Sequence, residues 1–175
     1  MEELSILGVS LMVPQKIPRL DMPEIKKLLK ERGKVIPEHE DLDAEAEKLL
    51  GEIVEEKYGS NFVFTLGYPW TKRPFYHMRP EHNPKVTKSF DLIYNGVEIA
   101  TGAQREHRLE ILEKQCKEKG IDFKKFEFYR DIFRYGPIPH GGVGMGLDRI
   151  VEQMLKLGNI REAILLPRDP ERLTP

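Results

Sequence analysis

Apolar residues recur along the chain with the periods of both helices and strands. The clearest helical pattern covers Asp41 to Tyr58, where the apolar positions fall three or four residues apart: Leu42, Ala46, Leu49, Leu50, Ile53 and Val54. Asp41 or Asp43 can cap the start of this helix, and Gly59 follows its end. We therefore expect an amphipathic helix here that packs against a sheet.

Shorter segments with similar patterns complete the set of expected elements. Helices are predicted over Asp21 to Arg32, Arg105 to Lys119, Asp122 to Phe133 and Leu147 to Leu155. Strands are predicted over Leu4 to Val13, Asn61 to Leu66 and Ala163 to Leu166. Together with the hairpin described next, they predict an α+β fold, a mostly antiparallel β-sheet flanked by helices.

The segment from Ser89 to Arg105 carries the strongest turn signal. Two apolar-rich runs flank Asn95-Gly96, a dipeptide that favours a type I′ turn because both of its central residues need positive φ. Such a turn places Asp91 and Glu98 on one face of the hairpin, roughly 7–8 Å apart or less at Cβ. Two carboxylates this close repel unless a cation lies between them, and magnesium, which prefers oxygen ligands, suits that position.

Strict alternation along the second strand would place Thr101 and Arg105 on the face opposite Glu98. One extra residue, a β-bulge between Ile99 and Gly102, would bring both onto the carboxylate face, and a glycine inside a strand often marks a bulge. The alternative is a surface hairpin with ordinary exposed charges. The two hypotheses differ in whether these side chains share one face with Asp91.

A second informative segment runs from His140 to Ile150, where alternating glycines lead directly into a helix. Glycine lets a phosphate approach the backbone, a helix N-terminus stabilises anions, and Arg149 adds a planar cation suited to phosphate. The pattern is no P-loop, because no Lys-Ser or Lys-Thr follows the glycines, and it fits a dinucleotide fingerprint poorly. The alternative is a tight strand-to-helix junction in which glycine only permits close packing.

Composition narrows the functional classes. The 175 residues carry a net charge of −1, which does not suggest a nucleic-acid-binding surface. The single cysteine, Cys116, excludes a disulfide framework, and we expect a buried thiol and a cytoplasmic location. The five histidines lack metal-ligand spacing, and no apolar run reaches membrane-spanning length. The aromatic segment Gly67 to Tyr76 is interpreted as a loop anchored on the core, although its aromatic residues and Arg73 could instead line a pocket.

Two of these segments resemble one family. Residues 90–105, with Phe-Asp-Leu-Ile and Glu-Ile-Ala-Thr-Gly-Ala-Gln-Arg, and residues 140–149, His-Gly-Gly-Val-Gly-Met-Gly-Leu-Asp-Arg, resemble the C-terminal half of the class II aminoacyl-tRNA synthetase catalytic domain. Gly-Ala-Gln-Arg and the ending over residues 167–175 are similar to the aspartyl type of archaea and eukaryotes. The asparaginyl type usually lacks Gly-Ala-Gln-Arg. The resemblance extends from about Ile17 to Pro175.

The resemblance implies a role for each matching residue. Glu98 would bind magnesium and, through it, ATP, while Asp91 and Thr101 would help to hold the metal. Thr101 stands where the family usually has serine and would also contact the amino acid. Arg105 would bind the side-chain carboxylate of aspartate, for which a bidentate arginine is well suited. Further ATP contacts are implied for the glycine-rich junction, at Gly144, Gly146, Leu147, Asp148 and Arg149.

The implied reaction is formation of aspartyl adenylate from aspartate and ATP with Mg²⁺. The family's first and second motifs and its anticodon-binding domain have no counterpart in this sequence. Residues 1–175 are therefore expected to form a single domain, a truncated catalytic core with the third motif over 140–157. We expect tRNA as a partner only if a missing half or domain is supplied. A homodimer is compatible with the family. No membrane partner is expected. Two other hypotheses are a truncated paralogue that acts as a binding module, and a synthetase relative that makes asparagine.

Overall fold

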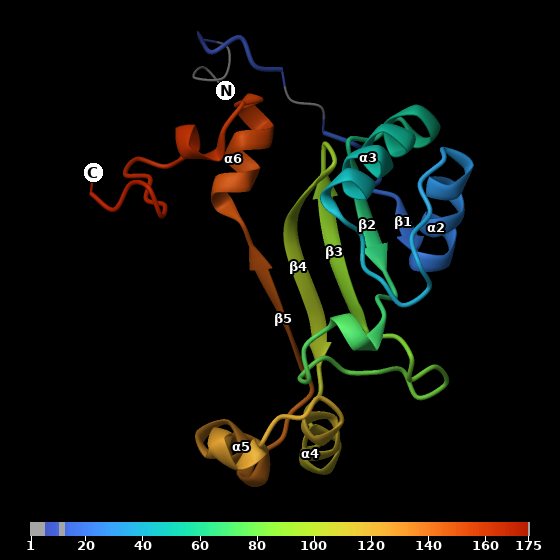
Figure 1. Cartoon of the computed structure of the whole chain (residues 1–175), viewed down its shortest axis with the longest axis vertical. Helices are drawn as coiled ribbons and strands as arrows, with labels where there is room; N and C mark the ends of the chain where they lie inside the picture. Colours follow the sequence, from blue (N-terminus) through green and yellow to red (C-terminus); the bar gives the residue numbers. More distant parts are fainter. Residues whose placement is uncertain (1–5, 11–12, 175) are drawn as a thin grey trace.

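The computed structural model describes residues 6–10 and 13–174, and a five-stranded sheet runs through its centre (Figure 1). The strands are β1 Arg19–Asp21, β2 Phe62–Leu66, β3 Ser89–Tyr94, β4 Val97–Arg105 and β5 His140–Met145. They lie side by side in chain order, with β1 and β2 parallel and each other neighbouring pair antiparallel. The predicted α+β fold with a mostly antiparallel sheet is confirmed.

The helices lie around this sheet in three places. They are α2 Met22–Glu31, α3 Ala44–Tyr58, α4 Leu109–Glu118, α5 Glu127–Tyr135 and α6 Leu147–Leu155, with 3₁₀ turns η1 Trp70–Lys72, η2 Phe123–Phe126 and η3 Ile160–Ala163. In Figure 1, α2 and α3 lie together beside β1 to β3, α4 and α5 lie beyond one end of the strands, and α6 follows β5. None of the helices in the described part of the chain is long and apolar enough to cross a membrane.

The main core lies between α2, α3 and one face of the sheet. Its buried members are Leu20, Met22, Ile25, Leu28, Leu29, Ala46, Leu50, Ile53, Val54, Val63, Tyr68 and Ile93. The expected caps of α3 are present, since Asp43 accepts the backbone N–H of Ala46 at 2.8 Å and Gly59 adopts a φ of 61°. A Cβ atom on Gly51 would lie 2.6 Å from the backbone nitrogen of Gly96, so α3 and the β3–β4 turn pack in backbone contact. This contact fixes α3 beside the hairpin.

A second core joins α4, η2 and α5 to the aromatic loop before β3. Its buried members are Leu112, Cys116, Phe123 and Phe133, with Phe75 and Tyr76 packed against them. The aromatic residues of the loop are therefore anchored as predicted. Cys116 is fully buried, and burial raises the pKa of its thiol to about 11, in keeping with a packing role.

Three sequence predictions need correction. Residues 163–166 form no strand: η3 ends at Ala163 and Leu165 is 94% exposed, because this apolar run pairs with no strand in the described part of the chain. The strand predicted over Leu4 to Val13 lies partly outside the described residues, and residues 6–10 do not form one. The helix predicted from Arg105 begins at Leu109, because Arg105 still belongs to β4.

Candidate functional site

The β3–β4 hairpin has both the predicted turn and the predicted bulge. Residues 95 and 96 have φ angles of 49° and 78°, as a type I′ turn requires. Ile93 pairs with Glu98, but the register then shifts, so that Asp91 pairs with Thr101. The extra residue on β4 brings Thr101 onto the face that carries Asp91 and Glu98. The hypothesis of a shared carboxylate face is confirmed, and the simple surface hairpin is excluded.

Asp91 lies at the centre of a buried polar cluster. Its carboxylate accepts two hydrogen bonds from Arg73, at 2.6 Å and 3.1 Å, and one from the Thr101 hydroxyl at 2.5 Å. The Arg73 guanidinium lies over the Tyr68 ring, 3.6 Å from its centroid, and its other acidic neighbour is Asp41 at 3.4 Å. Asp91 is only 3% exposed. The sequence-based anchor interpretation therefore holds for the aromatic residues of this loop, whereas Arg73 belongs to the candidate site.

Glu98 lies at the turn end of the same face, between a second carboxylate and an arginine. Arg149, in the first turn of α6, donates to the Glu98 backbone carbonyl at 2.8 Å and approaches its carboxylate to 3.7 Å. Glu47 of α3 accepts the Glu98 backbone N–H at 3.3 Å. Burial and the negative charge of nearby carboxylates raise the pKa of Glu98, and they raise that of Glu47 to about 7. Two carboxyl groups with raised pKa values therefore lie together at this end.

The donor atoms on this face are of the type that magnesium prefers. Glu98 offers a carboxylate and Thr101 a hydroxyl oxygen, whereas both Asp91 carboxylate oxygens are already bound by Arg73 or Thr101. Mg²⁺ commonly takes only one or two protein carboxylates together with substrate phosphates. Within residues 6–10 and 13–174, no three His, Cys, Asp or Glu side chains form a ready metal cage. The residues therefore fit a magnesium ion that shares its ligands with a phosphate, and not an all-protein cage.

Arg105 ends the same face at the other end of β4, and it is not neutralised. Within the described residues its guanidinium forms no ion pair with an acidic side chain, and Nη1 is buried without a hydrogen-bond partner. The guanidinium lies over Tyr76 at 4.6 Å from the ring centroid. A Cβ atom on Gly142 would lie 3.0 Å from Nη2, so the glycine makes room for the guanidinium. Arg105 is thus held in place by stacking, and its guanidinium has no acidic partner among the described residues.

His77 is a member of the site that sequence reasoning missed. It forms an antiparallel bridge with Arg105, which places both side chains on one face. His77 is 5% exposed and its Nδ1 has no hydrogen-bond partner. Burial, and then the positive charges of Arg105 and Arg73, lower the pKa of its imidazole to about 4, so the ring is neutral at pH 7. No spacing rule could have found it, because its place depends on a bridge to a distant strand.

The glycine-rich segment forms β5 and the start of α6 beside this face. Gly144 pairs with Thr101, and a Cβ atom added to it would meet no atom within 4 Å. Gly146 caps α6 and donates its N–H to Ile99 at 2.8 Å. Leu147 is 71% exposed and Asp148 is also exposed, both in the first turn of α6. Close packing therefore does not explain why residue 144 is a glycine. Open space for a ligand beside the backbone is the better explanation.

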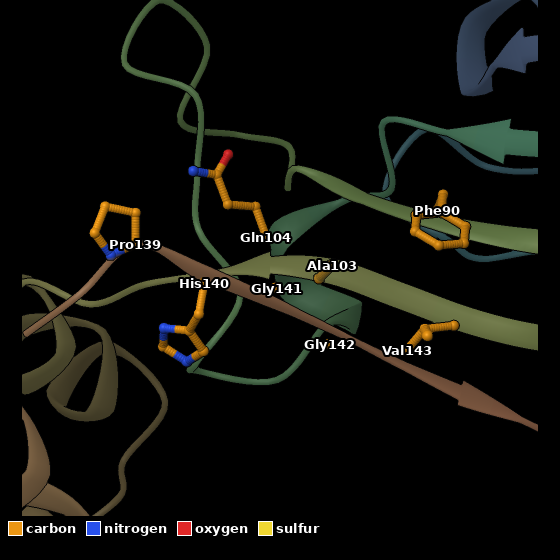
Figure 2. Close-up of a pocket in the computed structure, with 8 residues that line it drawn as sticks. All are labelled: Phe90, Ala103, Gln104, Pro139, His140, Gly141, Gly142 and Val143. Carbon is orange, nitrogen blue, oxygen red and sulfur yellow. The ribbon is translucent and has the colours of Figure 1, made fainter.

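A surface hollow of about 630 Å³ lies between β4 and β5, but it is not this site. Its lining includes Phe90 and Gln104, which alternate with Asp91 and Arg105 and so point to the other side of the sheet. In Figure 2, Gln104 and His140 extend to opposite sides of the ribbon, and His140 is the partner of Arg105. The candidate site is therefore the open face with Asp91, Glu98, Thr101, Arg105 and Arg149.

Comparisons with known proteins identify the family of the chain. A family model described as tRNA synthetases class II (D, K and N) matches residues 2–170. An aspartate–tRNA(Asp/Asn) ligase of Aeropyrum pernix is 50% identical over 98% of this chain and 40% of its own length. An aspartate–tRNA(Asp) ligase of Pyrococcus abyssi is 49% identical over 99% of this chain and 40% of its own length. The solved aspartyl tRNA synthetase of Entamoeba histolytica covers 95% of this chain and 34% of its own, with 38% identity and a TM-score of 0.91. The chain thus spans about 40% of the length of the curated relatives it matches.

Proposed function

The chain belongs to the class II tRNA synthetases of the D, K and N group, and we propose that it provides the aspartate- and ATP-binding part of an aspartate–tRNA ligase site. The observation that carries this proposal is Arg105, a fixed guanidinium without an acidic partner in the described residues, on the same face as Glu98 and Thr101. A site built for a divalent cation alone would have no use for such a group, whereas a ligand carboxylate pairs with it directly.

Each site residue has a role in this proposal. Arg105 binds the side-chain carboxylate of aspartate, and Thr101 contacts the amino acid. Glu98 and Thr101 offer oxygens to Mg²⁺, and Asp91 helps to fix the metal site indirectly, because its carboxylate holds Thr101 and Arg73 in place. When bound, Mg²⁺ supplies positive charge that offsets the charge of the ATP phosphates.

The phosphate end of ATP lies near the start of α6 in this proposal. Arg149 binds the γ-phosphate, while the backbone at Gly144, Gly146, Leu147 and Asp148 lets the nucleotide approach. The N-terminus of α6 adds free N–H groups, and Gly144 leaves open space beside Thr101. Aspartate and ATP would therefore meet along β4, between Arg105 and Glu98.

The chemistry proposed is adenylate formation. The α-carboxylate of aspartate attacks the α-phosphorus of ATP, a P–O bond forms, and the bond to the leaving pyrophosphate breaks. The protein contributes by holding the two reactants in line and by stabilising charge, without a covalent intermediate. The chain spans about 40% of the length of its curated relatives, so we propose that full activity also draws on regions that residues 1–175 do not cover. Transfer to tRNA, a homodimer and a cytoplasmic setting belong to the same proposal.

The test is aspartate-dependent ATP–pyrophosphate exchange by the purified chain, together with calorimetry for L-aspartate and for Mg-ATP. Exchange would establish the ligase-type reaction, and binding of both ligands without exchange would indicate a half-site that needs its partner. ATP binding without aspartate binding would favour a binding module and refute the aspartate site. Asparagine formed from aspartate, ATP and ammonia would support the asparagine-making relative. Arg134→Ala, an exposed arginine on α5, serves as the control for loss of positive charge.

A further inference from the structure

We propose that Lys119 is a positioning residue of the candidate site, which from α4 fixes the turn η1 and so the arginine that follows it, Arg73. The inference rests on the proposed Mg-ATP site and adds to it a side chain from a helix outside the two motifs. Lys119 touches no ligand in this arrangement. It acts through Arg73, whose guanidinium holds Asp91 and Thr101 in place.

The ammonium group of Lys119 binds the backbone of η1 directly. It donates to the carbonyls of Trp70 and Thr71, each at 2.8 Å. The Trp70 carbonyl also accepts the backbone N–H of Arg73 at 3.2 Å. A single oxygen therefore joins the lysine to the backbone of Arg73, so the position of the one depends on that of the other.

The side chain of Trp70 ties the same turn to α4. The indole is 8% exposed, and the Lys119 ammonium lies 4.5 Å from the centroid of its ring. The Arg79 guanidinium also lies over the ring at 4.5 Å, and it forms an ion pair with Glu118 of α4 at 2.9 Å. Both the backbone and the side chain of Trp70 are therefore held by groups of this helix or by a cation bound to it.

The ammonium group occupies this place at a cost in solvation. Burial, and then the positive charge of Arg79, lower the pKa of Lys119, and the charge of Glu118 opposes them only in part. The compensation is the pair of charge-assisted hydrogen bonds to η1. The lysine is therefore directed at the turn and not merely at solvent.

The side chain of Arg73 in turn orients a proposed metal ligand. It donates to both carboxylate oxygens of Asp91 and, at 3.3 Å, to the Thr101 hydroxyl, which itself donates to Asp91 at 2.5 Å. A hydroxyl has one donor and two acceptor lone pairs, so these contacts leave one lone pair of Thr101 for Mg²⁺. Residues that orient metal ligands tune metal affinity without touching the metal. We therefore expect a loosened η1 to weaken the binding of Mg-ATP.

The test compares Lys119→Met and Lys119→Arg with the parent by calorimetry, using Mg-ATP and, separately, ATP in EDTA. Methionine keeps the aliphatic stem without the ammonium group, whereas arginine keeps a cation with N–H donors. We expect Lys119→Met to weaken Mg-ATP binding about 10-fold, the lower end of the range for residues that orient metal ligands. ATP affinity in EDTA stays unchanged, and Lys119→Arg recovers most of the loss. Lys117→Met, at an exposed lysine of the same helix, is the matched control and should bind Mg-ATP as the parent does.

A double variant separates positioning through Arg73 from an independent structural role. If Lys119 acts through Arg73, adding Lys119→Met to Arg73→Met should change Mg-ATP affinity by less than about 2-fold, because the side chain that transmits the effect is already gone. Losses that multiply would overturn the inference. If Arg73→Met does not fold, Lys119→Arg decides: Mg-ATP affinity as low as in Lys119→Met would refute the role. If Lys119→Met does not fold, Lys119→Gln replaces it with the same expectations.

Several other results would also refute this role. Parental Mg-ATP affinity in Lys119→Met would remove it, and so would an equal loss of ATP affinity in EDTA, which indicates a merely structural effect. Trp70 is the single tryptophan of the chain, so unchanged tryptophan emission in Lys119→Met would contradict the contact with η1. Loss of Mg-ATP binding in Arg149→Ala but not in Lys119→Met would leave the proposed function standing without Lys119. A parent chain that binds no Mg-ATP would refute both.

Discussion

The buried pair of Arg73 and Asp91 offers a quantitative test of how the site is held together. Their side chains are 10% and 4% exposed, and Asp91 accepts two hydrogen bonds from the guanidinium. Removing one member of a buried pair leaves the other charge uncompensated, which typically costs about 3–5 kcal/mol. Arg73 retains Asp41 at 3.4 Å and the Tyr68 ring, so Asp91→Asn should lie near the lower limit, about 3 kcal/mol. Arg73→Met should cost more, because Asp91 would keep only the Thr101 hydroxyl.

The measurement is urea unfolding of the two single variants and the double variant, Asp91→Asn with Arg73→Met. The double variant leaves neither charge buried and unpaired. We therefore expect it to lose less stability than the sum of the two single losses, by about 2 kcal/mol or more. Asp148→Asn, at an exposed carboxylate on α6, is the control and should change stability by less than about 0.5 kcal/mol. Additive losses, or single variants within 1 kcal/mol of the parent, would refute the central role of this pair.

Three further predictions concern the groups around it. Arg105→Ala should weaken aspartate binding far more than ATP binding and Arg149→Ala should do the reverse, so equal losses in calorimetry would remove the role assignment. Gly142→Ala would push a Cβ atom to 3.0 Å from Nη2 of Arg105 and so lower aspartate affinity. Burial raises the pKa of Glu47 to about 7, above its unfolded value, so ionised Glu47 costs stability as pH rises from about 4.5 to 7. Glu47→Gln should therefore raise the urea midpoint at pH 8 more than at pH 5, and an equal change at both would contradict this assignment.

The hairpin could be predicted because its signals are local. The turn is encoded by residues 95–96. The bulge falls at Ile99, within the predicted range, but not at Gly102, which pairs regularly with Phe90. The structure adds the reason for Gly102: a Cβ atom there would lie 2.5 Å from the Phe90 ring on the neighbouring strand. The same local reasoning failed over residues 163–166, because an apolar run becomes a strand only where a neighbouring strand is available to pair with it.

The contacts of Arg73 and His77 could not be predicted because they are not local, although the sequence admits Arg73 as a pocket-lining residue. Arg73 reaches Asp91 across 18 residues of sequence, and the loop that carries it is held by the packing of Phe75 and Tyr76 on the second core and by backbone hydrogen bonds to β4. Sequence patterns locate the carboxylates of a site when they lie on one hairpin. They do not locate the groups that partner those carboxylates when the groups come from a loop whose path is set by tertiary packing.

The charges along β4 are therefore distributed unequally, and this inequality orients any ligand. The carboxyl groups of Glu98 and Glu47 lie together at the turn end, and Arg73 neutralises Asp91 in the middle. Arg105, at the far end, has no acidic partner among the described residues. Glu98 and Arg105 are seven positions apart on the strand, which corresponds to roughly 20 Å at the usual rise per residue. A ligand bound along the strand must therefore place a carboxylate at the Arg105 end and a cation at the Glu98 end. Aspartate with Mg-ATP meets both conditions, whereas a ligand with positive charge at the Arg105 end would contradict this orientation.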